Sequence, residues 1–281
     1  MNASAIDIRP LSGCLGAEIH GLDLARPLDA ETFDRVERAF LDHLVLFFRD
    51  QDLTPAQQVA FAARFGPVGR YPLAEPIPEH PDIIAVVKEP GQTTNFGGVW
   101  HSDTTYLEAP SLGSLLYAKE VPARGGDTLF ANMYLAYESL SPGLRRLLGG
   151  LSAINSAGKN KETLRADHLA GGAMTGTAVA AHGLRAEHPV VRRHPVTGRQ
   201  ALYVNRAHTV AFKGMTEAES AGLLGTLFEH AARPEFTCRF RWRAGSLALW
   251  DNRCTQHYPI NDYHGQRRVM HRATIEGDRP A

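Results

Sequence analysis

The sequence predicts a mainly β protein with flanking helices. Short apolar segments recur along the chain, and Gly and Pro separate them, as in β-sandwiches and barrels. The helical patterns do not alternate regularly with these segments, which argues against a parallel strand-helix-strand sheet. With 281 residues, of which 43% are hydrophobic and 21% charged, the chain can bury a substantial core.

The N-terminal third combines short strands with two helices. Strands are expected at 6–9, 14–20, 45–48 and 83–87. Phe33, Val36 and Phe40 recur at helical spacing, which predicts a helix over 29–44. Thr54 as a cap and Pro55 at the first helical position predict a second helix that Gly66 closes.

The rest of the chain is richer in strands. They are expected at 113–118, 128–131, 190–193, 201–205, 236–242, 246–250 and 268–275. Two helices interrupt them, one at 141–147 and one at 216–233 that opens with a capping box. A Gly-, Ala- and Thr-rich stretch around 158–188 has no clear period and is interpreted as a mobile lid. We find no repeat or linker, and therefore expect a single domain over 1–281.

Charge and cysteine content narrow the function classes. Lys plus Arg equals Asp plus Glu at 30 each, so no overall field attracts nucleic acid or an anionic membrane. No apolar run is long enough to cross a bilayer, and the first residues lack a secretory pattern, so a cytoplasmic enzyme is expected. The odd set of Cys14, Cys238 and Cys254 indicates buried free thiols rather than a disulfide framework.

Two distant segments predict a metal site. His101 and Asp103 are two residues apart, so in an extended strand both side chains project from one face. His257 follows a buried strand far downstream and can supply a third ligand in a folded-over β structure. Two histidines and one carboxylate leave three positions on iron open, as oxygen activation requires. Each histidine alone could equally be a structural side chain; His208, His264 and His271 are kept as structural or secondary candidates.

The C-terminal strand predicts anion binding. Arg268, Met270 and Arg272 share one face of it, and two inward arginines are costly unless each meets an anion. A solvated edge strand is the alternative. Thr128 could add a hydroxyl to a carboxylate site, although Gly-Gly-Asp-Thr is also an ordinary turn into a strand.

Four motifs together resemble one enzyme family. They are WHSDTTY, PARGGDTLF, WDNRCTQHYPINDY and RRVMHRATI, and they cover nearly the whole chain in the family's order. This combination resembles the taurine dioxygenase and 2,4-dichlorophenoxyacetate dioxygenase family of iron(II)- and 2-oxoglutarate-dependent enzymes. The resemblance implies a double-stranded β-helix, or jelly-roll, core. It also implies Fe(II), 2-oxoglutarate and dioxygen as cofactor and co-substrates, with His101, Asp103 and His257 as the metal ligands and catalytic residues.

The same resemblance assigns the remaining site residues. Thr128 and Arg268 would bind the distal carboxylate of 2-oxoglutarate, and Arg272 would hold the acidic group of the primary substrate. Tyr71 and Asn95, in the two regions where members differ, are predicted substrate contacts. Arg70 is interpreted as a solvated loop charge. Taurine dioxygenase has a histidine soon after the helix that ends in Phe-Gly. This chain has no histidine between Gly66 and Glu79, so taurine is not the expected substrate.

The predicted activity is hydroxylation of a small anionic organic substrate, such as a sulfonate, sulfate ester or carboxylate, with cleavage where the attacked carbon bears a heteroatom. The expected partners are that substrate and further copies of the chain, without nucleic acid or membrane. Two alternatives stay open: a non-catalytic jelly-roll binding protein and a metal-dependent hydrolase. The chain lacks the H-E-x-x-H spacing that would favour a zinc hydrolase.

Overall fold

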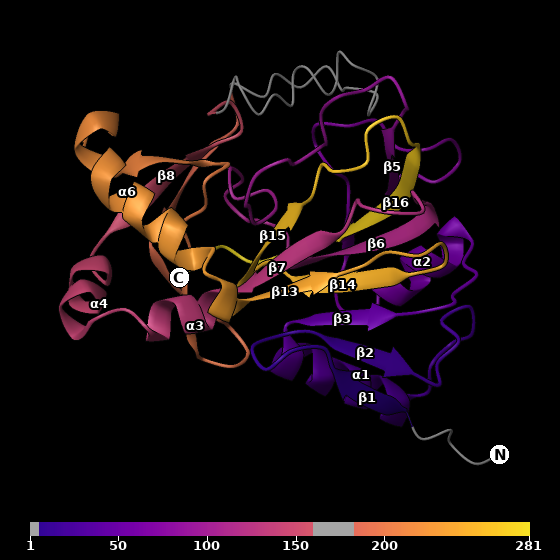
Figure 1. Ribbon diagram of the computed structural model, residues 1–281. Coiled ribbons are helices and arrows are strands. Elements are labelled where there is room, and N and C mark those ends of the chain that lie inside the picture. The colour runs from indigo at the N-terminus through magenta and orange to yellow at the C-terminus, as the bar shows by residue number, and fades with distance from the viewer. Residues whose placement is uncertain (1–5, 160–182) are drawn as a thin grey trace.

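A large, mostly antiparallel sheet forms one half of the core (Figure 1). The computed structural model describes residues 6–159 and 183–281. The sheet order is β1 (Asp7–Pro10), β2 (Ala17–His20), β3 (Val45–Phe48), β14 (Leu247–Asp251), β6 (Gly113–Glu120), β16 (Arg268–Ile275) and β4 (Val68–Gly69), with β5 (Ile83–Lys88) also paired to β16. Only β2 and β3 run parallel to each other. The first and last segments of the chain therefore meet in one sheet.

A smaller antiparallel sheet provides the second layer. Its order is β13 (Thr237–Phe240), β7 (Thr128–Asn132) and β15 (Thr255–Pro259). Phe47 from β3 stacks on Phe240 of β13 at 3.9 Å between ring centroids and meets Phe130 of β7 edge-on. The two sheets thus enclose one apolar core, and the predicted mainly β, jelly-roll fold is confirmed.

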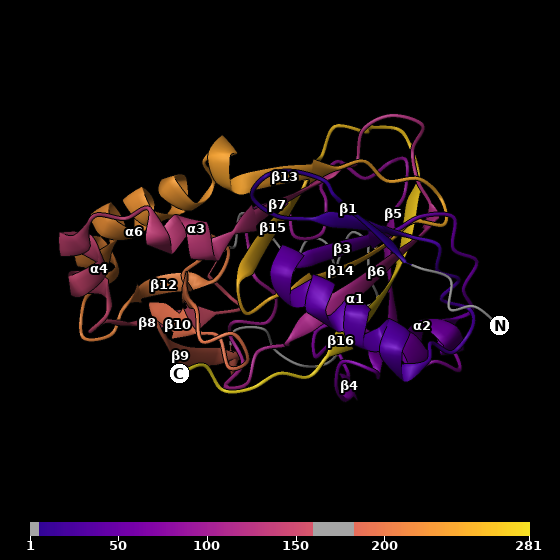
Figure 2. The ribbon, with the colours of Figure 1, turned by 90° about the horizontal axis from the view of Figure 1, so that it is seen from below.

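Two helices cover the outer face of the large sheet. α1 (Ala30–His43) begins at the Asp29 cap, and α2 (Pro55–Ala62) begins at a complete capping box. Along β3, Val45 and Phe47 face the smaller sheet, whereas Leu46 and Phe48 face these helices. This explains why the strand is apolar without interruption: both of its faces are buried. Figure 2 shows α1 and α2 on the same side of the sheet.

Additional strands and helices extend the core at one end, to the left in Figure 1. They are β8 (Ser152–Ser156), β9 (Arg185–Pro189), β10 (Val191–Arg193), β11 (Gln200–Leu202), β12 (Thr209–Phe212), α3 (Met133–Glu138), α4 (Pro142–Leu148), α6 (Glu217–Ala231) and the 3-10 turn η2 (Pro234–Phe236). β8 lies between β12 and β9, and β10 pairs with β11. No helix in the described ranges is long and apolar enough to cross a membrane.

Most predicted elements are present. β4, α3, β8, β12 and β15 were not predicted, because their short segments show too little periodicity to stand out from loops. β9 occupies the end of the stretch interpreted as a lid, while residues 160–182 of that stretch lie outside the described residues. The three cysteines are free thiols as predicted; Cys238 and Cys254 are buried, whereas Cys14, also predicted to be buried, is only partly buried.

The contact between Phe47 and Phe240 should dominate the stability of the layered core. Phe47 is fully buried, so we expect Phe47→Ala to lower the free energy of unfolding by about 3–5 kcal/mol. Urea denaturation followed by fluorescence measures this. Leu147→Ala is the control, because Leu147 is 54% exposed on α4 and should change stability by less than about 0.5 kcal/mol. Equal losses in both variants would contradict this description of the core.

Candidate metal and 2-oxo acid site

A single β bridge brings the two predicted histidine ligands together. The His101 N–H donates to the His257 carbonyl at 3.1 Å, and the His257 N–H donates to the His101 carbonyl at 2.8 Å. The imidazole centroids are 4.0 Å apart. His257 lies within β15 rather than after a strand, and Asp103 lies in a turn rather than in an extended strand with His101. The three predicted ligands do lie close together. The β bridge between His101 and His257 brings them together, and the expected extended strand through His101 and Asp103 does not form.

The three side chains could hold one metal ion. Asp103 Oδ1 is 3.7 Å from His101 Nε2 and 3.9 Å from His257 Nε2. Ligand atoms bind such ions at about 2.0–2.2 Å, so two ligands of one ion can be up to about 4.3 Å apart. All three residues are buried, and their ligand atoms form a common cluster. Two imidazoles and one carboxylate on one side of an ion suit iron(II) and leave positions for other ligands.

The orientation and charge of the histidines suit metal binding. His101 Nδ1 lies 2.7 Å from the Val99 carbonyl, so this nitrogen carries the proton and Nε2 presents its lone pair to the ion. Gly97 makes the packing possible, because a Cβ there would lie 2.7 Å from His101 Cε1 and φ is +73°. Burial and the neighbouring His101 hold the pKa of His257 well below its usual range, so that its imidazole is neutral.

Three donors hold the outer oxygen of Asp103. Asp103 Oδ2 accepts from Ser114 Oγ at 3.0 Å, Trp250 Nε1 at 3.2 Å and Arg272 Nη2 at 2.9 Å. This leaves Oδ1 directed at the histidines. Burial alone would raise the pKa of Asp103, but Arg272, the histidines and Ser114 outweigh it and hold that pKa well below its usual range. The carboxylate is therefore ionised and fixed in one orientation.

The turn after Asp103 is held by residues that the sequence did not single out. Thr104 adopts φ +51°, an uncommon conformation for a β-branched residue, and its hydroxyl accepts from the Ser111 N–H at 2.9 Å. The Asn252 side-chain oxygen accepts from the Asp103 N–H at 3.2 Å and from Trp250 Nε1 at 3.0 Å. The position of Asn252 in the Trp-Asp-Asn-Arg run was visible in the sequence, but its contacts with Asp103 depend on tertiary pairing.

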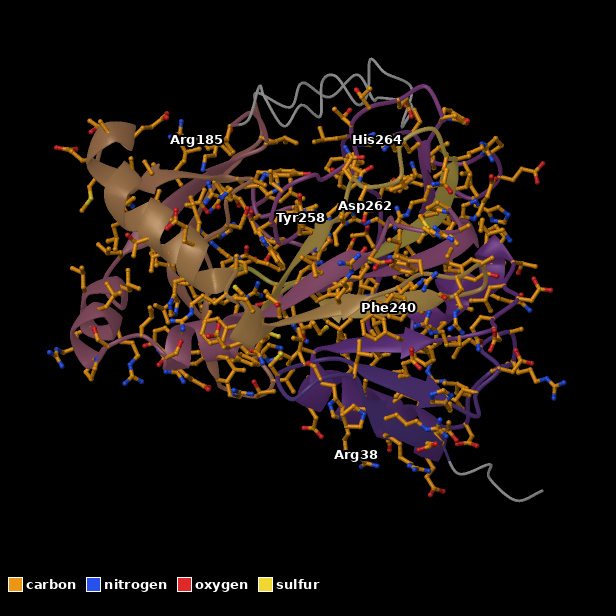
Figure 3. The ribbon with its side chains drawn as sticks, in the orientation of Figure 1. Arg38, Arg185, Phe240, Tyr258, Asp262 and His264 are labelled. Carbon is orange, nitrogen blue, oxygen red and sulfur yellow. The ribbon has the colours of Figure 1, made fainter. Side chains whose placement is uncertain are left out.

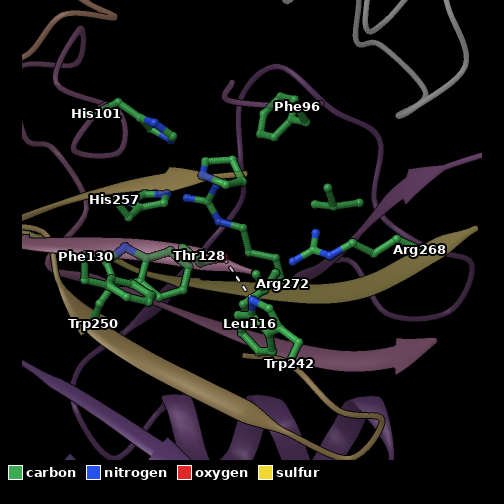
Figure 4. Close-up of a pocket in the computed structure, with 12 residues that line it drawn as sticks. Phe96, His101, Leu116, Thr128, Phe130, Trp242, Trp250, His257, Arg268 and Arg272 are labelled. Atoms are coloured by element: carbon green, nitrogen blue, oxygen red, sulfur yellow. Dashed lines mark hydrogen bonds between the residues drawn. The ribbon is translucent and has the colours of Figure 1, made fainter. Parts of the chain in front are cut away.

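A pocket beside the three ligands contains the predicted anion-binding residues (Figure 4). His101, His257, Thr128, Arg268 and Arg272 all line it, together with the apolar side chains of Val86, Phe96, Leu116, Phe130, Trp242, Trp250 and Pro259. Both arginine side chains reach into the pocket from β16. Arg267 on the opposite face is exposed, so the predicted division of the strand into two faces is confirmed.

Arg268 and Thr128 have donors available for a ligand. Arg268 is 6% exposed, and its Nε and Nη2 have no hydrogen-bond partner among the described residues. Trp242 Nε1 donates to Thr128 Oγ1 at 2.9 Å, so the Thr128 hydroxyl proton is directed elsewhere. A carboxylate between the two could accept from both side chains. Burial lowers the pKa of Arg268, which means that an anion there would stabilise its charged form.

Arg272 joins the metal ligands to the pocket. One nitrogen contacts Asp103 and Ser114, while the buried Nε has no partner among the described residues. Its guanidinium carbon lies 5.2 Å from the centre of the Tyr71 ring. The Tyr71 hydroxyl accepts from Tyr106 at 3.3 Å, so Tyr71 forms a buried aromatic wall next to Arg272. Arg70 beside it is exposed, as the interpretation as a loop charge requires.

Asn95, predicted to contact substrate, is engaged with the loop between β15 and β16. Its amide nitrogen donates to the Ile260 carbonyl at 3.0 Å, and its oxygen accepts from the Tyr263 hydroxyl at 2.9 Å. These contacts account for both ends of the side-chain amide. Figure 3 shows the same loop through Asp262 and His264, at the top of the molecule. His264 is exposed there, whereas His208 is buried with its ring 6.2 Å from that of His101.

A second group of possible ligands is a structural network instead. His194 Nδ1 accepts from two backbone N–H groups, so Nε2 carries the proton that it donates to Asp251 Oδ2 at 3.0 Å. Arg253 pairs with both oxygens of Asp251, at 2.8 and 2.6 Å. Burial raises the pKa of Cys254 well above its usual range, so it stays a thiol. No ligand atom in this group is left for a metal; the network instead fixes the turn that leads to β15.

Comparison with known proteins places the chain in a family. The family model for taurine catabolism dioxygenase TauD, TfdA family matches residues 7–274. An alpha-ketoglutarate-dependent sulfate ester dioxygenase from Pseudomonas putida is 36% identical, over 99% of this chain and 92% of that protein. The alpha-ketoglutarate-dependent 2,4-dichlorophenoxyacetate dioxygenase from Cupriavidus pinatubonensis is 34% identical, over 96% and 97%.

A solved structure has the same fold with a metal and a 2-oxo acid analogue. It is AAD-2 in complex with Mn(II) and N-oxalylglycine, at 32% identity and a TM-score of 0.78, over 98% of this chain and 99% of that one. Fold, ligand cluster and arginine-lined pocket define an iron(II)- and 2-oxoglutarate-dependent dioxygenase, which uses dioxygen as its second co-substrate. The chain belongs to the TauD, TfdA family.

Loss of one imidazole should strongly weaken metal binding. We expect His257→Ala to weaken Mn(II) affinity by on the order of 100-fold or more, because removal of a partner outside the ligand set already costs about 10–100-fold. Calorimetric titration with Mn(II) in the absence of oxygen measures this. His264→Ala is the matched control, since His264 is exposed on a loop, and it should bind Mn(II) like the parent. Unchanged binding by the His257 variant would show that the cluster is not the metal site.

Proposed function

We propose that His101, Asp103 and His257 hold the catalytic iron and that Arg268 with Thr128 binds the distal carboxylate of 2-oxoglutarate. The observation that carries the assignment is the buried Arg268, two of whose nitrogens have no hydrogen-bond partner in the part of the chain that the structure describes, in the same pocket as the ligand cluster. When bound, iron(II) with 2-oxoglutarate activates dioxygen and couples decarboxylation of the 2-oxo acid to oxidation of a substrate C–H bond. The protein supplies the ligands, the carboxylate anchor and walls that exclude water.

The substrate is proposed to be a small organic anion with an apolar body, such as a sulfate ester, a sulfonate or a carboxylate. Arg272 supports this, because its free Nε is buried next to the ligand cluster and Asp103 occupies only one of its nitrogens. Tyr71 and Phe96 form an apolar wall nearby, with ring centroids 6.1 Å apart. Relatives are named for sulfate esters and for phenoxy acids, which share this combination of anion and apolar body.

Where oxidation falls on a carbon that bears the ester oxygen, the hydroxylated product would break down and release the anion. Tyr71 is proposed to pack against the substrate body. Asn95 is proposed to act on the substrate side by holding the loop at 259–263 that borders the pocket, since its amide contacts that loop. A binding protein or a hydrolase is not favoured, because neither needs the ligand cluster and the arginine-lined pocket together.

The domain organisation, location and partners of the chain are also proposed. The chain is proposed to act as a single dioxygenase domain, supported by the family match across residues 7–274. It is proposed to work in the cytoplasm and to form homo-oligomers. The balanced charge of 30 basic and 30 acidic residues supports partners other than nucleic acid.

Turnover should depend on an anionic substrate and on Arg272. Measurement of succinate formation across sulfate esters, sulfonates and phenoxy acids should find at least one that stimulates it. For that compound we expect Arg272→Ala to raise KM by about 10-fold or more, because a charged hydrogen bond to an anion is lost. Arg267→Ala is the matched control, since Arg267 pairs with Glu89 and Glu120 on the outer face of the same strand.

Arg272 also contacts Asp103, so metal affinity must be measured in the same variants. A KM increase with Mn(II) affinity largely retained supports substrate binding. If no anion stimulates succinate formation, or if KM is the same in parent and Arg272→Ala, the proposed substrate class is wrong.

A further inference from the structure

A second buried cation lies directly opposite Arg268. β5 and β16 pair antiparallel with Lys88 and Arg268 as Cα partners, so both side chains leave the sheet on the same side. They are 4% and 6% exposed. Like charges opposite each other in a sheet are unfavourable, and more so when they are buried. The described residues place no carboxylate within ion-pair distance of either cation.

Burial and the neighbouring Arg268 lower the pKa of Lys88, and among the described residues no acid pairs with its ammonium. Its ammonium donates to the side-chain oxygen of Asn261 at 2.6 Å and lies 4.1 Å from the centre of the Tyr263 ring. Tyr263 also interacts with the charge of Arg268. One side chain therefore interacts with both cations. Asp262, the nearest acid on this loop, is 43% exposed and accepts from the Gly126 N–H.

Two clustered positive charges whose nearest acids, Asp127 and Asp262, pair with Arg239 instead form a site for an anion. We propose that Lys88 is a positioning residue of the 2-oxoglutarate site: it adds a second positive charge behind Arg268 and holds Tyr263 against that guanidinium. The inference rests on the proposed assignment of Arg268 to the distal carboxylate. Lys88 does not line the pocket, so it acts on the carboxylate through space and through Tyr263. The anion offsets the repulsion between the two cations, which Asp127 and Asp262 offset only from a longer distance.

Two consequences distinguish this role from a purely structural one. A charge that acts on the ligand should matter for ligand affinity even when the hydrogen bond to Asn261 is kept. Loss of that charge should also leave the ligand-free fold about as stable as the parent, because repulsion with Arg268 disappears together with the contacts of the ammonium. A structural tether would instead show a lower melting temperature and little change in affinity.

The experiment measures N-oxalylglycine binding to the Mn(II)-loaded protein by calorimetry, without turnover. Lys88→Gln removes the charge but retains a donor for Asn261, and we expect it to raise Kd about 10-fold. Lys88→Met, which removes the donor as well, should give a similar increase. Asn261→Ala keeps the charge and removes the tether, and should change Kd by less than about 2-fold. Lys119→Met, at an exposed lysine on β6, is the control for net charge.

Arg268→Met tests the role of Arg268 separately from that of Lys88. If it leaves Kd unchanged, the assignment of Arg268 is wrong, and the inference falls with it. If Arg268→Met weakens binding but both Lys88 variants bind no worse than Lys119→Met, only the role of Lys88 is refuted. An Asn261→Ala effect as large as that of Lys88→Gln would also overturn it, because the tether alone would then explain the loss. A Lys88 variant that melts at the parent temperature and binds about 10-fold more weakly is the expected result.

Discussion

The β bridge between His101 and His257 is the contact on which the site depends. Two backbone hydrogen bonds, of 3.1 and 2.8 Å, fasten the loop after β5 to a strand of the smaller sheet. They fix both imidazoles and bring the turn at Asp103 alongside. Residues from the large sheet then orient the carboxylate, through Ser114 on β6 and Trp250 on β14. The jelly roll is thus used as a rigid frame that joins segments far apart in the sequence.

Charge balance provides the second constraint. Around the pocket, the buried cations Arg272, Arg268 and Lys88 lie near two buried carboxylates, Asp103 and Asp127. Arg272 pairs with Asp103 and Arg239 pairs with Asp127, so among the described residues neither Arg268 nor Lys88 has an acid at ion-pair distance. Buried charge of one sign is unfavourable until a ligand neutralises it. The distal carboxylate of a bound 2-oxo acid would place a negative charge beside Arg268 and Lys88, so these cations would contribute to both the strength and the specificity of its binding.

The metal ligands could be predicted from the sequence, but the residues that orient them could not. His101, Asp103 and His257 could be singled out because imidazole and carboxylate are distinctive in an apolar context, and the inward faces of Arg268 and Arg272 followed from strand periodicity. Ser114 and Asn252 could not be assigned, since each is an ordinary polar residue until pairing between β6 and β14 places it beside Asp103. Lys88 was missed for the same reason: its significance lies in its register with Arg268. Asn95 is the opposite case: it was predicted to contact substrate, but its side-chain amide contacts the loop that contains Tyr263.

His101, Asp103 and His257 are proposed to hold iron(II), and the neighbouring pocket is proposed to bind a 2-oxo acid beside it. Absorption spectroscopy of the parent protein under anaerobic conditions tests this most directly. Addition of iron(II) and 2-oxoglutarate together should produce a weak visible charge-transfer band that neither produces alone. Absence of the band, with both ligands at saturating concentration and the protein folded, would show that the cluster and the pocket do not bind iron(II) and the 2-oxo acid together.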